Sequence, residues 1–183
     1  MKTGIKGINL IKKFESLHDG DLKIIGLQPK MCPAGIWTEG YGRAMRDDKG
    51  NFIKWNKNKE LAYSRISINN EEEAYNCLVQ DLLVYEKIVL LKIKVALSQN
   101  QFDALVSHTY NTGGSLTLFN HINNKMRKEI IQDWFVSKYI SISGENNGKD
   151  DNKNGIIDEV GERETLKGLV LRRKEESELF FTI

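Results

Sequence analysis

Cysteine is scarce in this sequence, and long apolar runs are missing. Among 183 residues only Cys32 and Cys77 are cysteines. Two thiols so far apart do not make the disulfide framework of a small secreted domain, and we expect both to be reduced, as in a protein that folds in a cytoplasm. Nothing from Met1 to Phe14 has the pattern of a signal peptide, and no stretch is apolar over the length that a membrane-spanning helix needs.

A large excess of charge of one sign is also absent. The chain has 27 basic and 25 acidic residues, which gives a formal net charge of +2. Nucleic-acid-binding proteins usually carry a marked basic excess, so we expect no nucleic-acid partner. A mild basic excess is compatible with an anionic polymer as substrate. The length suits one compact domain or two small lobes around a shared core.

The spacing of apolar residues predicts helices on both sides of one irregular segment. A short amphipathic helix is expected over residues 5–17, with Glu15 near its C-terminal end. The next stretch, up to Ala62, contains both prolines and the turn signal Asp47-Asp48-Lys49-Gly50, which predicts short strands. Beyond residue 70 the pattern becomes helical again, and helices are expected over 71–95, 98–113, 116–127, 129–139 and 166–180.

This order of elements indicates an α+β fold with the strands segregated to one end. We expect a single domain over residues 1–183, with a small β-rich lobe at about 16–68. A larger helical lobe would cover about 70–183 and pack against the first helix. The long helix that begins at residue 71 would join the two lobes, and a cleft between them is a natural place for a site.

The residues after Glu15 carry the most specific pattern in the chain. Cys32 is followed, after five intervening residues, by Thr38, and Thr38 is followed by Gly40-Tyr41-Gly42. This arrangement resembles the active-site hairpin of the phage-type lysozymes, glycoside hydrolase family 24. That family carries a Glu at the end of a first helix, then an Asp or Cys, then a Thr. The similarity touches most of the chain, because it continues in segments 97–107, 110–113 and 168–180.

The resemblance implies a lysozyme-like fold and a role for each residue of the motif. Glu15 would be the general acid, Cys32 would occupy the Asp/Cys position, and Thr38 would position the attacking water. Glycoside hydrolysis needs such a proton donor together with a second group that activates water or attacks the sugar. A glutamate at the end of an apolar helix beside a cleft can stay protonated near neutral pH, because desolvation raises its pKa.

Three further residues are candidates for substrate binding. Tyr41 and Asn111 could line the sugar cleft, although packing is at least as good an explanation for each. Arg172 resembles a family position that could bind an anionic glycan. The equal alternative for Arg172 is a structural ion pair with Glu175, Glu176 or an earlier acidic residue.

The chain departs from the family pattern between Glu15 and Cys32. Sixteen residues separate them, where the family usually has eight, so about eight extra residues lie in segment 18–31. We favour a lengthened surface loop that leaves the site intact, because such insertions cost little stability. The alternative is that the insertion alters the cleft and brings polar side chains to the substrate, with His18, Asp19 or Asp21 as candidates.

Cysteine at the position of Cys32 leaves the mechanism open. A free thiol has a pKa near 8.5 and is mostly uncharged at pH 7, which makes it a poor electrostatic stabiliser. It could hold a water together with Thr38, or attack as a thiolate if it were activated. A buried structural cysteine is the remaining alternative for Cys32, and Cys77 is expected to be such a core residue.

One loop has a weak resemblance to a calcium site. Gly161 stands where an EF-hand loop needs its bidentate Glu, so we expect no metal and no cofactor. His108 and His121 have no third ligand at metal-binding spacing. The residues that match the front of an EF-hand loop are Asp150, Asn152, Asn154 and Asp158.

Taken with the resemblance, the sequence predicts an endolysin that hydrolyses the β-1,4 bond between N-acetylmuramic acid and N-acetylglucosamine in bacterial peptidoglycan. The predicted enzyme is a monomer in the host cytoplasm that does not insert into the membrane and reaches the wall through a separate holin-type pore. Two alternative functions stay open: a lytic transglycosylase and a non-catalytic cell-wall-binding module on the same fold. Target species, the role of Cys32 and the contribution of loop 143–164 are not determined by the sequence.

Overall fold

The structure, a computed structural model, describes residues 1–32, 34–144 and 148–183. Residue 33 belongs to the predicted hairpin and residues 145–147 to the predicted loop 143–164, and both lie outside the described residues.

The described chain divides into two compact units. The helical unit consists of residues 1–10 and 84–183, and the hairpin unit consists of residues 11–83. The division runs through the first helix and through the long helix that follows residue 70. A single domain with lobes at about 16–68 and 70–183 stays a prediction.

The described elements confirm a mixed α+β chain with most of its helices after residue 70. The sequence did not predict α2 or the strands β4 and β5, because elements of five and three residues are too short to show a period. The helices are α1 (Ile5–Glu15), α2 (Lys59–Tyr63), α3 (Glu71–Lys92), α4 (Gln99–Thr112), α5 (Leu116–Asn123), α6 (Lys128–Ser137) and α7 (Lys167–Phe181), with a 3₁₀ turn at Asn56–Asn58. The strands are β1 (Lys30–Met31), β2 (Trp37–Glu39), β3 (Arg43–Ala44), β4 (Ser141–Ser143) and β5 (Arg163–Thr165).

In the hairpin unit, β1, β2 and β3 form an antiparallel sheet in that order. The register pairs Lys30 with Thr38, which fixes both residues at the same level of the sheet. The extra residues of the insertion form a loop that is closed at its base, where the Gly20 N–H donates to the Gln28 carbonyl oxygen at 3.0 Å. The same unit contains a small apolar core of Trp37, Met45, Ile53 and Ala62.

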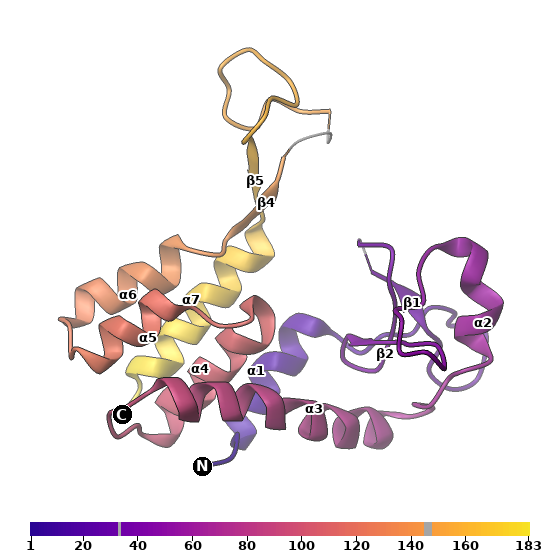
Figure 1. Cartoon of the computed structure of the whole chain (residues 1–183), viewed down its shortest axis with the longest axis horizontal. Coiled ribbons are helices and arrows are strands. Elements are labelled where there is room, and N and C mark those ends of the chain that lie inside the picture. The colour runs from indigo at the N-terminus through magenta and orange to yellow at the C-terminus, as the bar shows by residue number, and fades with distance from the viewer. Residues whose placement is uncertain (33, 145–147) are drawn as a thin grey trace. The chain divides into compact units, whose positions relative to one another are not determined.

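In the helical unit, α7 packs against α4 and α6, as Figure 1 shows. Helix α4 begins with the predicted capping box, in which the Ser98 hydroxyl accepts from the Gln101 N–H and the Gln101 side chain accepts from the Ser98 N–H. It ends at Gly113, whose φ of 78° gives the left-handed C-cap that glycine adopts without strain. Among the described residues, no helix is both long enough and apolar enough to cross a membrane.

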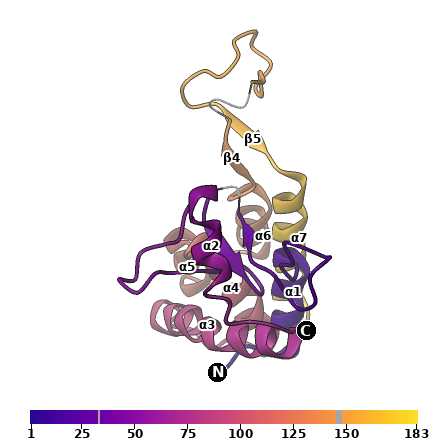
Figure 2. The ribbon, with the colours of Figure 1, turned by 90° about the vertical axis from the view of Figure 1, so that its right-hand side faces the viewer.

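Strands β4 and β5 form an antiparallel hairpin between α6 and α7, with Ser141 opposite Thr165. Figures 1 and 2 show β4, β5 and the described residues that follow β4 and precede β5 extending away from the ends of α6 and α7 in both views. The described residues of the predicted polar loop 143–164 therefore belong to this hairpin, and β4 and β5 hold its base.

Candidate active site

A pocket of about 440 Å³ in the hairpin unit contains the three residues of the lysozyme-like motif. Glu15, Cys32 and Thr38 all line it, although sixteen residues separate the first two in the sequence. The remaining lining residues are His18, Lys30, Met31, Ile36, Gly42 and Ala44.

Glu15 reaches the pocket because α1 ends there. It is the last residue of α1, and Ser16, whose N–H closes the final turn on Lys12, has a φ of 58° that turns the chain away. The Glu15 carboxylate lies beside Gly42, where a Cβ would come 3.3 Å from Oε2 and where φ is +87°. Glycine at this position therefore leaves the space that the partly buried carboxylate occupies.

Thr38 lies on β2 with only 5% of its surface exposed, and its hydroxyl is held on two sides. It donates to the Lys30 carbonyl oxygen at 2.8 Å, across the β1–β2 pair. The Nδ1 atom of His18 lies 2.8 Å from the same hydroxyl oxygen. The His18 backbone is itself fixed, because its N–H donates to the Gly40 carbonyl oxygen at 2.8 Å.

Cys32 lies at the turn between β1 and β2 and is a partly buried free thiol. Its N–H donates to Ile36 O, and its carbonyl oxygen accepts from the Gly35 N–H, both at 2.8 Å. This turn places the side chain in the pocket, so the position is not that of a core cysteine. Cys77 was expected in the core, but it is only partly buried and accepts a hydrogen bond from the Arg43 guanidinium at 3.1 Å.

The insertion was expected either to form a surface loop that leaves the site intact or to bring polar side chains to the cleft. The structure agrees in part with each of these interpretations. The extra residues loop out beyond the Gly20–Gln28 closure, and the motif residues still share one pocket. The first residue of the segment, His18, nevertheless lines that pocket. Sequence reasoning did not single out Lys30, because its contribution depends on the register of a two-residue strand.

The charges around His18 favour its neutral form. Burial lowers the pKa of the imidazole below its usual 6.5, and the nearby Lys30 ammonium lowers it further. The Glu15 carboxylate and a hydrogen bond to the Glu15 backbone oppose this shift. The ring is therefore mostly uncharged at neutral pH.

Tyr41 and Arg172 were predicted to bind substrate, but neither is among the residues that line the pocket. Each side chain makes a structural contact. Tyr41 is 5% exposed, and its hydroxyl donates to Glu71 Oε1 at 3.1 Å, which supports the packing alternative. Arg172 is 3% exposed, and its Nε lies 3.1 Å from Glu176 Oε1. Arg172 therefore makes the ion pair that was the equal alternative, and its contact with a glycan stays a prediction. Asn111 is exposed near the C-terminus of α4.

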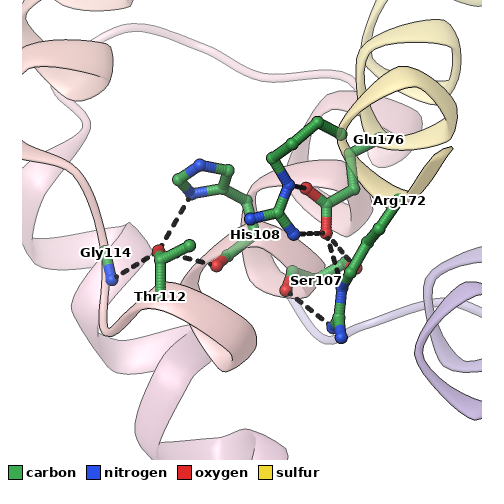
Figure 3. Close-up of polar contacts among 7 residues, drawn as sticks. Ser107, His108, Thr112, Gly114, Arg172 and Glu176 are labelled. Carbon is green, nitrogen blue, oxygen red and sulfur yellow. Dashed lines mark hydrogen bonds and ion pairs between the residues drawn. The ribbon is translucent and has the colours of Figure 1, made fainter. Parts of the chain in front are cut away.

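Arg172 belongs to a buried polar network between α4 and α7, drawn in Figure 3. Glu176 accepts from the Ser107 hydroxyl at 2.8 Å and from the Arg173 guanidinium at 2.8 Å. Burial raises the pKa of the Glu176 carboxyl, and the charges of Arg173 and Arg172 oppose that shift. The network therefore joins α4 and α7.

His108 lies next to this network and has no exposed surface. Its Nδ1 is 3.3 Å from the Thr112 hydroxyl, and its ring meets Phe135 and Tyr139 edge to face. Burial, reinforced by the charges of Arg173 and Arg172, lowers its pKa to about 3. His108 is thus a neutral packing residue.

The low pKa of His108 makes stability depend on pH. Below pH 6.5 the unfolded chain binds a proton at this position that the folded chain does not bind, so acid destabilises the fold. This group alone is expected to lower the free energy of unfolding by about 1.2 kcal/mol between pH 6 and pH 5. Urea unfolding at both pH values would measure the change, and His108→Gln should show a smaller one. Equal pH dependence in the two proteins would contradict the assignment.

The loop with EF-hand resemblance is organised by its own hydrogen bonds. The Asp150 carboxylate accepts from the N–H groups of Asn154 and Gly155, and Asp158 accepts from the Gly148 N–H. The described residues include no cluster of three His, Cys, Asp or Glu side chains suited to a metal ion. The expectation that this loop holds no metal stays a prediction.

Comparison with known proteins places this geometry in a family. Residues 23–176 match the phage lysozyme family, a range that includes Cys32 and Thr38 and begins after Glu15. An endolysin of Acyrthosiphon pisum secondary endosymbiont phage 1 is 29% identical over 180 residues, which cover 98% of each chain.

Two solved structures share the fold over nearly the whole chain. An endolysin from Escherichia coli O157:H7 phage FAHEc1 superposes with a TM-score of 0.68 at 25% identity, covering 99% of this chain and 94% of the other. The muramidase domain of SpmX from Asticaccaulis excentricus superposes with a TM-score of 0.66 at 25% identity, covering 100% and 99%. The predicted lysozyme-like fold is therefore confirmed.

Proposed function

Because this chain belongs to the phage lysozyme family and is a peptidoglycan-hydrolysing endolysin, we propose that it cleaves the β-1,4 bond between N-acetylmuramic acid and N-acetylglucosamine in the pocket of the hairpin unit. The observation that carries this assignment is the convergence of Glu15, Cys32 and Thr38 on that one pocket. In the sequence these residues are separated by an insertion that could have moved them apart.

In the proposed reaction, Glu15 donates its proton to the leaving glycosidic oxygen. Thr38 and Cys32 hold the attacking water on the opposite face of the sugar. Among the lining residues, Glu15 is the one carboxylate, so the pocket offers no second carboxylate to form a glycosyl-enzyme ester. Direct attack by water inverts the anomeric centre, and inversion is therefore the expected outcome.

The biological setting is part of the same proposal. The enzyme acts as a monomer on bacterial peptidoglycan, needs no cofactor and binds no nucleic acid. A separate holin-type pore lets it pass from the host cytoplasm to the wall. Asn111 on α4 contributes to glycan binding. These assignments rest on the family and on the sequence rather than on contacts in the structure.

Product analysis tests the reaction. Purified cell walls digested by the wild-type enzyme should release muropeptides with reducing N-acetylmuramic acid ends, which mass spectrometry detects after borohydride reduction. In the first turnover, proton NMR should show the α-anomer, as inversion requires. Anhydro-muramyl products would identify a lytic transglycosylase instead. Walls that bind the protein without releasing any fragment would identify a binding module.

A further inference from the structure

We propose that His18 is a positioning residue of this reaction, which orients the Thr38 hydroxyl and receives, through that hydroxyl, the proton of the attacking water. The inference rests on the proposed function, because it supplies a destination for the proton that hydrolysis removes from water. His18 acts through Thr38 and need not touch the sugar.

The geometry around Thr38 provides the path. One hydroxyl oxygen has Lys30 O at 2.8 Å and His18 Nδ1 at 2.8 Å, so its single proton has two acceptors. When the proton points to Lys30, Nδ1–H donates to the hydroxyl oxygen. When Nδ1 is unprotonated, the hydroxyl donates to it instead. In both states a lone pair of the Thr38 oxygen is left for a water that donates to it from the pocket.

The pocket needs a proton acceptor such as His18, because Glu15 and Cys32 have other roles in the reaction. Glu15 acts as the acid and must carry a proton at the start. Cys32 stands where the family pattern also allows an aspartate, and in the proposed reaction it holds the attacking water. Among the lining residues, His18 is the one that is neutral and basic near pH 7.

The proton transfers balance in a single step. The water oxygen bonds to the anomeric carbon while one of its O–H bonds breaks and that proton moves to Thr38 Oγ1. The original Thr38 hydroxyl proton moves to His18 Nδ1, which becomes an imidazolium. The glycosidic C–O bond breaks, its electron pair stays on the leaving oxygen, and Glu15 protonates that oxygen. Exchange with solvent then returns a proton to Glu15 and removes one from His18.

The charges that face His18 suit this sequence of events. They come from Glu15 on α1 and Lys30 on β1, while the Cys32 thiol lies at the turn after β1. Burial and Lys30 keep the imidazole neutral before the reaction. When Glu15 gives up its proton, its new negative charge favours the imidazolium that forms at the same moment. The acid and the relay are thus electrostatically coupled.

His18→Asn tests the inference. Asparagine keeps a hydrogen-bonding atom near the position of Nδ1 but cannot be protonated in the working pH range. We expect kcat on soluble glycan strands to fall by about 100-fold, with KM little changed, because base catalysis contributes about 10²–10⁴-fold. The wild-type kcat should also fall on the acidic side, below the ordinary histidine pKa of 6.5, and this limb should be absent in the variant. His121→Asn, on α5, is the matched control and should retain wild-type kinetics.

Two further variants protect the test against misfolding. His18→Gly should regain activity when imidazole is added, which a purely structural role would not produce. The double variant with Thr38→Val and His18→Asn should lose no more activity than the more impaired of the two single variants, because both residues serve one relay. Wild-type kcat and an unchanged pH profile in His18→Asn would overturn the inference. Loss of the proposed function itself would look different, since Glu15→Gln would then be as active as the wild type.

Discussion

Glu15→Gln is expected to lower the rate of wall clearing by about 10²–10⁴-fold, the range in which general acid catalysis contributes. The amide has nearly the same size and can still form hydrogen bonds at the end of α1, so the pocket should keep its shape. It has no proton to give to the leaving oxygen, and that step would fall to water. Turbidity of purified walls measures the rate.

A matched substitution separates the acid from a general effect of charge. Glu72→Gln makes the same chemical change at an exposed position in the first turn of α3. It should clear walls at the wild-type rate. Glu15→Gln should still sediment with the walls and melt at a similar temperature, because it changes one side chain of a preformed pocket. Equal clearing by Glu15→Gln and the wild type would show that the acid lies elsewhere.

Glu176→Ala is expected to destabilise the helical unit by about 3–5 kcal/mol, the usual cost of removing one partner from a buried ion pair. Glu176 has no exposed surface, and it faces Arg172 and Arg173, which are 3% and 0% exposed. Alanine would remove the carboxylate that pairs with both buried guanidinium groups. The substitution would also remove the hydrogen bond from Ser107 that joins α4 to α7.

The same helix offers the control for this measurement. Glu178 pairs with Lys174 at 3.9 Å, and both side chains are more than 60% exposed. Exposed pairs contribute about 0–1 kcal/mol, so Glu178→Ala should shift the urea unfolding midpoint only slightly. A Glu176→Ala midpoint as close to the wild type as that of Glu178→Ala would show that the network contributes little to stability.

The predictable part of the fold is the part with strong local signals. Helix α4 has its start in the Ser98–Gln101 pair and its end in Gly113, and the structure confirms both. Local signals failed where elements are short. Helix α2 and strands β4 and β5 owe their existence to neighbours that cover or pair with them, and such partners leave no periodic trace in three to five residues.

For the site, the sequence supplied the motif Glu15, Cys32 and Thr38, together with the interval that separates Cys32 from Thr38. Residue types and short intervals are properties of the chain, and a family pattern preserves them. The sequence could not determine that the long insertion closes on itself at Gly20 and Gln28, because loop closure depends on hydrogen bonds between distant backbone groups.

The sequence by itself therefore determined the family, the α+β class and three residues of the pocket. Only the tertiary structure decided which side chains surround them. It placed His18 and the Lys30 carbonyl on the Thr38 hydroxyl, and it paired Arg172 with Glu176. The physical reason is that hydrogen bonds and ion pairs act over about 3 Å in space, whatever the separation along the chain.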